Sequence, residues 1–182
     1  MTIICAIHEK GVGTWIGSDT TAFRDGIRRH DCGPKWVICG TRAIASSGSH
    51  VIHNLLEAHA DRLLAVSDIT PFEIAQRLWD ILTDFGFVPS PCEGEKGQVK
   101  SWTIYATESA VYHFTNDGGV YAIGSGEFCA DGAGEKFAYG AEYALGSIPT
   151  VTRMTRAIEA AIVLCSGCGG EPFVHLLKEG KL

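Results

Sequence analysis

Thr2 is the first residue whose type and position could do chemistry. Removal of Met1 is expected when a small residue follows it, and it would leave a threonine with a free α-amine beside its own hydroxyl. A hydroxyl is a weak nucleophile until a base takes its proton, and a neutral α-amine can serve as that base. The pKa of such an amine, about 7.7–8, lies close to neutral pH. Thr2 is therefore a candidate nucleophile, and the alternative is an ordinary Met-Thr start to a strand.

Three further polar residues stand where they could support such a nucleophile. Asp19 follows a Gly-Ser pair at the end of an apolar run, where a turn-forming aspartate is the alternative. Lys35 follows Gly-Pro at the start of another run, where a solvated strand start is the alternative. Ser125 stands between two glycines and could equally be the N-cap of a helix.

The seven cysteines are odd in number and irregularly spaced, and we recognise no secretory signal, so reduced thiols in the cytoplasm are expected. Cys165 and Cys168 form the one Cys-x-x-Cys, which leaves a small redox or metal-binding protein as an alternative class. His53 and Glu57 would share a helix face and could hold a metal, although such residues more often lie on a surface.

Length and composition indicate the number of domains and exclude some classes of partner. The length of 182 residues suits one domain, 1–182, with a sizeable core. A net charge of −6 gives no basic footprint, so nucleic acid is not expected as a partner. No apolar stretch approaches the roughly 20 residues that cross a bilayer, so no membrane association is expected.

The elements that would position these residues alternate in blocks. Short runs rich in β-branched residues predict strands at 2–7, 12–16, 35–39, 42–46, 101–107, 111–114, 120–123 and 173–177. Apolar residues at helical spacing predict helices over 50–64, from Thr70 to 85, and over 127–145 and 150–165. Thr70, Pro71 and Glu73 form a capping box. A polar, turn-rich stretch interrupts the pattern at 89–98.

Helices grouped after blocks of strands predict an α+β fold rather than a parallel α/β fold. Two packed antiparallel sheets with a helix pair on each outer face, a four-layer αββα sandwich, would bury every apolar face found.

At this point the sequence resembles a known family. The opening segment 2–7 followed by Gly17-Ser18-Asp19 is similar to the start of proteasome β-subunits and of the bacterial HslV peptidase, which are N-terminal-nucleophile hydrolases. Lys35 beginning a strand, small residues at 45–48, and Gly124-Ser125-Gly126 at a strand-to-helix junction follow in the family's order.

The resemblance implies a role for each site residue. Thr2 would be the nucleophile, and Lys35 would favour its alkoxide and lower the pKa of the neighbouring amine. Asp19 would orient both cationic groups, and Ser125 would bind the amine or a shuttling water. Backbone N–H groups of Ser46 and Ser47 would form the oxyanion hole.

The sequence also departs from the family. Cys165 stands where proteasome β-subunits have an Asp, Cys168 where they have a Ser, and Ser46 where the oxyanion loop has a Gly. In HslV-type sequences, carbonyls at a helix end hold an alkali cation, and the matching carbonyls here belong to Ile162, Cys165 and Cys168. No cofactor is otherwise implied beyond this possible Na⁺ ion.

The predicted function is a threonine-type endopeptidase that cuts unfolded polypeptides inside a self-associated ring in the cytoplasm. By analogy, an ATP-driven unfoldase would feed the ring. The alternatives are a non-catalytic ring subunit and the thiol-based protein already named.

Overall fold

Two antiparallel sheets form the centre of the computed structural model, which describes residues 2–24, 27–29, 32–65, 68–87, 102–115 and 118–178. The first sheet has the strand order β10-β1-β2-β11, with bounds Phe128–Gly132, Ile3–Glu9, Gly13–Ser18 and Phe173–Leu177. The second has the order β5-β6-β7-β8-β9, with bounds Trp36–Cys39, Arg42–Ser46, Thr103–Thr107, Ala110–Phe114 and Val120–Ile123.

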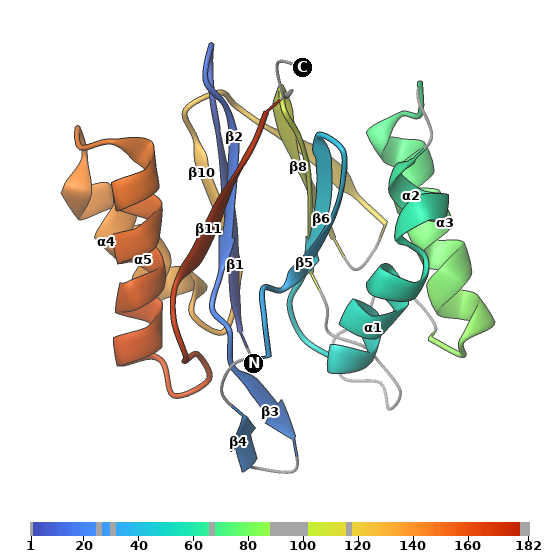
Figure 1. Cartoon of the computed structure of the whole chain (residues 1–182), viewed down its shortest axis with the longest axis horizontal. Helices are drawn as coiled ribbons and strands as arrows, with labels where there is room; N and C mark the ends of the chain where they lie inside the picture. Colours follow the sequence, from blue (N-terminus) through green and yellow to red (C-terminus); the bar gives the residue numbers. More distant parts are fainter. Residues whose placement is uncertain are drawn as a thin grey trace.

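Helices cover both outer faces, as Figure 1 shows. The first sheet is covered by α4 (Glu135–Leu145) and α5 (Thr150–Leu164). The second is covered by α1 (His50–Ala58), α2 (Ala60–Leu64) and α3 (Pro71–Asp84). The predicted α+β sandwich of four layers is therefore confirmed, with one predicted helix, 50–64, divided at His59.

Three hydrophobic clusters fill the spaces between the four layers. The middle one joins the two sheets and includes Ile4, Ile16 and Ile104. The outer two join each sheet to its helices. Because β1 lies between the second sheet and α5, it is buried on both faces, which explains its unbroken apolar run.

Helix α3 begins as predicted. The Thr70 hydroxyl accepts the N–H of Glu73 at 3.2 Å, and the Glu73 carboxylate accepts the N–H of Thr70 at 2.8 Å. Ile74, Leu78, Ile81 and Leu82 are buried on its inner face. Phe85, predicted on the same stripe, is instead the exposed C-terminal cap.

Two parts of the element order were wrong. The segment predicted as a helix over 127–145 starts with β10, which pairs with β1, and only then continues as α4. A free edge of β1 outweighs helix propensity there, because pairing satisfies its backbone groups. The hairpin of β3 (Ala22–Arg24) and β4 (Ile27–Arg29) was not predicted. The predicted interruption at 89–98 lies outside the described residues.

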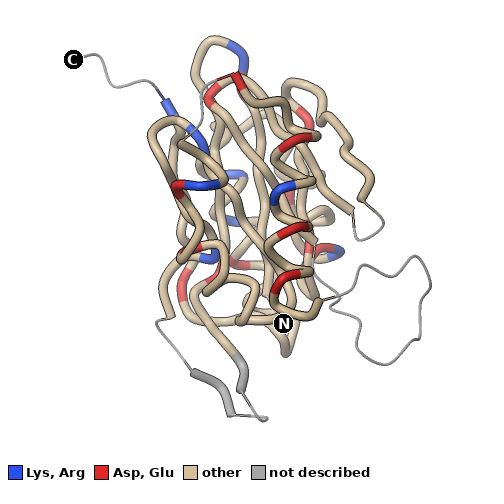
Figure 2. The backbone as a smooth tube through the Cα atoms, turned by 90° about the vertical axis from the view of Figure 1, so that its right-hand side faces the viewer, with Lys and Arg blue, Asp and Glu red and all other residues tan. Residues whose placement is uncertain are grey.

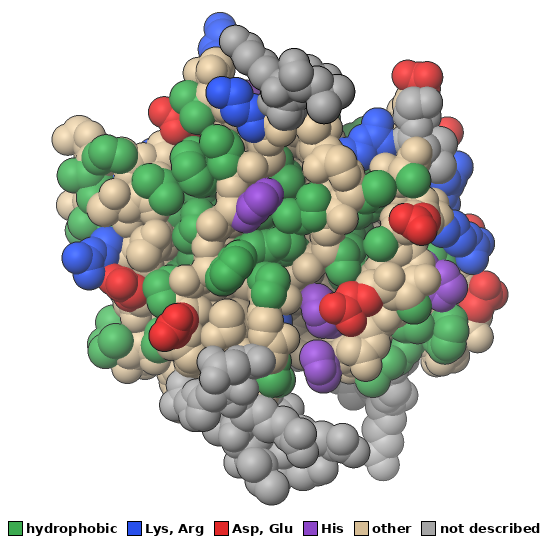
Figure 3. All heavy atoms as spheres, viewed as in Figure 1, with side chains coloured by type: hydrophobic (Ala, Val, Ile, Leu, Met, Phe, Trp, Pro, Cys, Tyr) green, Lys and Arg blue, Asp and Glu red, His purple; other side chains and the backbone are tan. Residues whose placement is uncertain are grey.

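Acidic and basic residues are interspersed on the surface. Figure 2 shows acidic and basic residues interspersed along the chain on the side that carries α1, α2 and α3. In the space-filling view of Figure 3, apolar side chains are spread between scattered charges. Within the described ranges, none of the helices combines the length and the apolar character needed to span a membrane.

Candidate active site

Thr2 and Asp19 meet because the antiparallel strands β1 and β2 place the start of one beside the end of the other. The Thr2 hydroxyl donates a hydrogen bond to Asp19 Oδ1. The backbone N–H of Ile3 donates to the same oxygen at 3.1 Å. Thr2 is 4% exposed and Asp19 is fully buried. The candidate nucleophile is thus held against a buried carboxylate.

The second oxygen of that carboxylate is held by the loop that follows α5. Gly169 donates its N–H to Asp19 Oδ2 at 2.9 Å, and the Gly169 carbonyl accepts the N–H of Thr20 at 3.3 Å. Gly170 has φ +74°, and a Cβ there would collide with Thr20 Oγ1. This contact was not predicted, although the paired glycines at 169 and 170 were a usable signal in the sequence.

Lys35 lies directly before β5 and is hydrogen-bonded to the same corner. Its backbone N–H donates to Ser18 Oγ at 3.0 Å, and the Ser18 hydroxyl donates to the carbonyl of Asp19 at 2.9 Å. Lys35 and Thr2 line one cavity of about 40 Å³. The structure therefore brings together three of the four predicted catalytic residues.

Burial shifts the pKa values of Asp19 and Lys35. It raises the pKa of Asp19, and the hydrogen bonds from Thr2, Ile3 and Gly169 and the attraction of Lys35 offset this only in part. Burial lowers the pKa of Lys35, against the attraction of Asp19. Asp19 is therefore a better proton acceptor, and Lys35 a better proton donor, than either would be in water.

Ser125 does not belong to this site. It is exposed in a turn whose neighbour, Gly126, donates its N–H to the carbonyl of His8 at 2.8 Å. His8 lies six residues along from Thr2, which corresponds to about 20 Å of extended strand. The assignment of Ser125 to the active site was wrong, because β10 intervenes between this turn and α4.

The strand-to-helix junction lies instead at Gly132-Ala133-Gly134, between β10 and α4. Gly132 has φ +104°, and a Cβ there would collide with the carbonyl oxygen of Thr2. Gly134 donates its N–H to that oxygen at 3.4 Å. Ala133 therefore occupies the position for which the family resemblance implied a serine.

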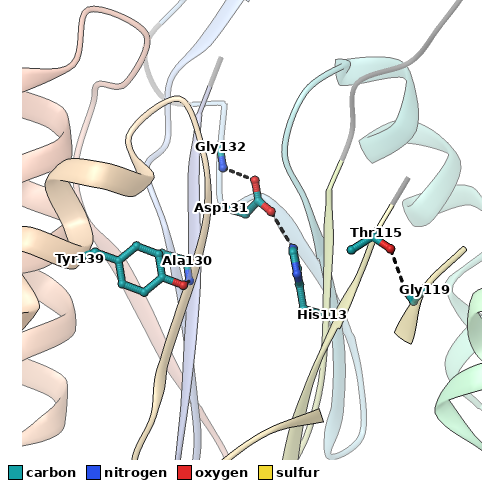
Figure 4. A network of polar contacts seen from close by, with 7 residues as sticks. All are labelled: His113, Thr115, Gly119, Ala130, Asp131, Gly132 and Tyr139. Atoms are coloured by element: carbon teal, nitrogen blue, oxygen red, sulfur yellow. Dashed lines mark hydrogen bonds and ion pairs between the residues drawn. The ribbon is translucent and has the colours of Figure 1, made fainter. Parts of the chain in front are cut away.

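The buried side chain of Asp131 contacts this junction and the second sheet. One of its carboxylate oxygens accepts the N–H of Gly132, and the other lies 2.7 Å from Nε2 of His113 on β8 (Figure 4). This pair connects the two sheets beside the residues that contact Thr2. Neither residue was singled out from the sequence, although an acid directly before the Gly-x-Gly was a usable signal.

The predicted oxyanion donors are engaged elsewhere. The N–H of Ser46 donates to the carbonyl of Lys35 at 3.2 Å, and the N–H of Ser47 donates to the carbonyl of Trp102 at 2.9 Å. Neither N–H is free in this conformation, so the assignment of the oxyanion hole to them is corrected. The buried hydroxyl of Ser46, which lines the cavity with Thr2, has no hydrogen-bond partner among the described residues.

The alkali-ion site stays a prediction. Helix α5 ends at Leu164, and the carbonyl of Cys165 accepts the N–H of Cys168 at 3.0 Å. A carbonyl oxygen has a second lone pair, so Cys165 is still compatible with an ion shared with Ile162 and Cys168.

The thiol alternative is disfavoured by burial. Cys168 is fully buried, and its pKa is raised well above that of a free thiol, which suppresses the thiolate that redox chemistry needs. In the part of the chain that the structure describes, no three His, Cys, Asp or Glu side chains are grouped to hold a metal. His53, expected on a surface, is buried, and its Nε2 lies 3.4 Å from the exposed Glu57 carboxylate.

Solved structures share this fold. The BPH protein of Thiobacillus denitrificans in complex with epoxomicin superposes with a TM-score of 0.75 at 19% identity, covering 97% of this chain and 100% of that one. A further structure of this BPH gives 0.73 at 18%, covering 98% and 100%. Eukaryotic HslV from Trypanosoma brucei gives 0.73 at 16%, covering 98% and 100%. No protein-family model matches the sequence, and neither does any curated protein.

These solved structures identify the fold. The chain has the fold of the HslV- and BPH-type proteasome-like peptidases, as the resemblance of its opening segment predicted.

Proposed function

We propose that the chain is a threonine-type peptidase that uses Thr2 as its nucleophile once Met1 has been removed. The observation that carries this proposal is the hydrogen bond from the Thr2 hydroxyl to the buried Asp19 carboxylate, in a cavity that Lys35 also lines. A hydroxyl, a proton acceptor and an ammonium converge at one strand end, where a peptide carbonyl could be attacked.

The reaction would proceed by acyl transfer. The freed α-amine of Thr2 takes the hydroxyl proton while Oγ1 attacks the peptide carbonyl carbon, and Lys35 stabilises the developing negative charge. The tetrahedral intermediate expels the amine half of the peptide, which takes the proton. Water then attacks the ester on Thr2, releases the carboxylic acid and restores the hydroxyl. Asp19 orients the nucleophile and stabilises the protonated amine through both steps.

A second proposal, a non-catalytic subunit of the same fold, is favoured by specific departures. Ala133 stands at the strand-to-helix junction, Cys165 and Cys168 replace an acid and a hydroxyl, and the N–H groups of Ser46 and Ser47 are both occupied. Each departure removes a polar group that would move or stabilise charge at Thr2.

The assembly and substrates follow from the same proposal. Rings of this chain would enclose the active sites and admit unfolded polypeptide, with an ATP-driven unfoldase as the feeding partner. These expectations rest on the fold of HslV-type proteins and on the cytoplasmic setting predicted from the free cysteines.

Peptide hydrolysis by the Thr2→Ala protein tests the proposal. We expect complete loss of cleavage of unfolded casein-like substrates with an unchanged elution volume on gel filtration. Thr2→Ser should retain partial activity, because it keeps the hydroxyl and the α-amine. Ordinary turnover by Thr2→Ala would remove Thr2 as nucleophile, and inactive wild-type protein would favour the non-catalytic alternative.

A further inference from the structure

The cavity beside Thr2 carries more polar groups than the proposed reaction uses. It is lined by residues of three separate segments: Thr21 and Ala22 after β2, Ser46 at the end of β6 with Gly48 and Ser49 after it, and His50 and His53 of α1. Helix α1 packs against β5 and β6, so these segments converge beside Lys35. Figure 3 shows histidine side chains gathered over α1 on the visible face.

Three of these side chains are buried, and each has one polar atom without a hydrogen-bond partner. Thr21 is fully buried, Ser46 is 5% exposed and His53 is 6% exposed. Thr21 Oγ1, Ser46 Oγ and His53 Nδ1 have no hydrogen-bond partner among the described residues. A buried polar group without a hydrogen-bond partner is unfavourable, so three such groups around one cavity favour a ligand that satisfies them.

The positive charge at the cavity comes from the ammonium of Lys35. Lys35 and the imidazoles of His50 and His53 line it, and the two imidazole rings stack with centroids 5.8 Å apart. The nearby acids are engaged: Asp19 accepts hydrogen bonds from Thr2, Ile3 and Gly169, and Glu57 contacts the Nε2 of His53 from an exposed position. A buried carboxylate needs such donors to offset its desolvation.

Size sets the class of ligand. A cavity needs about 10–15 Å³ to hold one water molecule. The cavity beside Thr2, at about 40 Å³, therefore accommodates a carboxylate group and not an aromatic ring. After attack by Thr2, the residue whose carbonyl carbon forms the ester is the one left covalently attached beside this cavity. Its side chain is therefore the group that the cavity would receive.

On this basis we propose that the cavity is a specificity subsite that selects a short acidic side chain, aspartate before glutamate, on the acyl side of the scissile bond. The inference rests on the proposed function for its setting in catalysis. The hydroxyls of Ser46 and Thr21 donate hydrogen bonds to the carboxylate, Lys35 supplies the positive charge, and His53 discriminates between the acid and its amide.

His53 acts as the selector through its two nitrogens. With Nε2–H directed at Glu57, the neutral ring presents Nδ1 as an acceptor, which suits the NH₂ group of an amide. Protonation turns Nδ1 into a donor, which suits a carboxylate. Burial is the main cause that lowers the pKa of His53, with repulsion from His50 and Lys35 adding to it and Glu57 opposing it. Selectivity for the acid should therefore increase as the pH falls.

Binding of N-acetylated tripeptide amides tests the subsite without requiring turnover. Peptides ending in Asp-amide, Asn-amide, Glu-amide and Leu-amide are titrated by calorimetry into the Thr2→Ala protein and the wild-type protein at pH 5 and pH 8. We expect Asp-amide to bind at least about tenfold more tightly than Asn-amide at the lower pH. His53→Gln and Ser46→Ala should each remove most of that ratio.

His59→Gln is the matched control, since His59 is a histidine of the same helical layer that does not line the cavity. It should leave the Asp-to-Asn ratio unchanged. Tightest binding of Leu-amide, or an Asp-to-Asn ratio that His53→Gln does not alter, would overturn the inference. Peptide cleavage is measured in parallel on wild-type protein. Asp-selective binding without cleavage would retain the subsite and reject the peptidase, and cleavage without Asp selectivity would do the reverse.

Discussion

The carboxylate of Asp19 accepts a 2.9 Å hydrogen bond from the N–H of Gly169, 150 residues further along the chain. This contact joins the loop after α5 to the end of β2, and the other oxygen of the same carboxylate holds Thr2 and Ile3. The geometry at the candidate nucleophile therefore depends on a segment near the other end of the sequence.

Gly170→Ala should weaken the contact between the loop after α5 and the end of β2. The backbone at Gly170 has φ +74°, and the new Cβ would collide with Thr20 Oγ1, so we expect a loss of about 1–3 kcal/mol in the free energy of unfolding. Gly140→Ala is the control, because Gly140 lies inside α4 with no atom close to an added Cβ, and it should gain about 1 kcal/mol. Urea unfolding measures both. Equal stability of the two variants would contradict the packing described for the loop.

Lys35→Met should separate catalysis from stability. It removes a buried ammonium and keeps most of the apolar stem, so peptide cleavage should fall at least about 100-fold while the midpoint of urea unfolding holds or rises. Lys136→Met, at an exposed position of α4, should leave cleavage unchanged. Full cleavage by Lys35→Met would show that the ammonium has no role in the reaction.

The titration of Asp19 should make the free energy of unfolding depend on pH. Its pKa is raised in the folded state, mainly by burial, so the folded chain holds this proton more tightly than the unfolded chain does. The contribution of Asp19 is then most favourable below its unfolded pKa of about 3.9, and it declines as the pH rises through the folded pKa.

Comparison of wild type with Asp19→Asn by urea unfolding across that window measures the effect. The stability of the wild type relative to Asp19→Asn should decrease as the pH rises from about 4. Asp80→Asn, at an exposed site on α3, should show no such trend relative to wild type. A trend of opposite sign would mean that the hydrogen bonds to Asp19 outweigh its burial.

Ser125→Ala should have little effect on peptide cleavage. Ser125 is exposed in a turn that contacts His8 at the far end of β1, so cleavage should stay within about twofold of wild type. Steady-state hydrolysis of a fluorogenic peptide gives the comparison. A loss on the scale expected for Lys35→Met would restore Ser125 to the active site and contradict the placement of β10.

The sequence predicted best what depends on neighbouring residues. The capping box of Thr70 and Glu73 and the apolar run of β1 are local patterns, and both were confirmed. Thr2, Asp19 and Lys35 were grouped through the family resemblance. The structure brings them to one corner because β1 pairs with β2 and the N–H of Lys35 donates to Ser18.

Features set by tertiary packing were missed. Two Gly-x-Gly segments, at 124–126 and 132–134, compete for one junction, and the serine in the first made it the more attractive choice. Only the pairing of β10 with β1 decides between them. Likewise, the occupied N–H groups of Ser46 and Ser47 and the burial of His53 arise from contacts between distant segments, which spacing along the chain does not encode.

Intact mass spectrometry after incubation with a peptide epoxyketone tests whether Thr2 is an N-terminal nucleophile. That warhead reacts with both the hydroxyl and the free amine of an N-terminal threonine. We expect a native mass lacking Met1 and a stable adduct of one inhibitor per chain, absent from Thr2→Ala. A native mass that retains Met1, with no adduct after prolonged incubation, would contradict this role of Thr2.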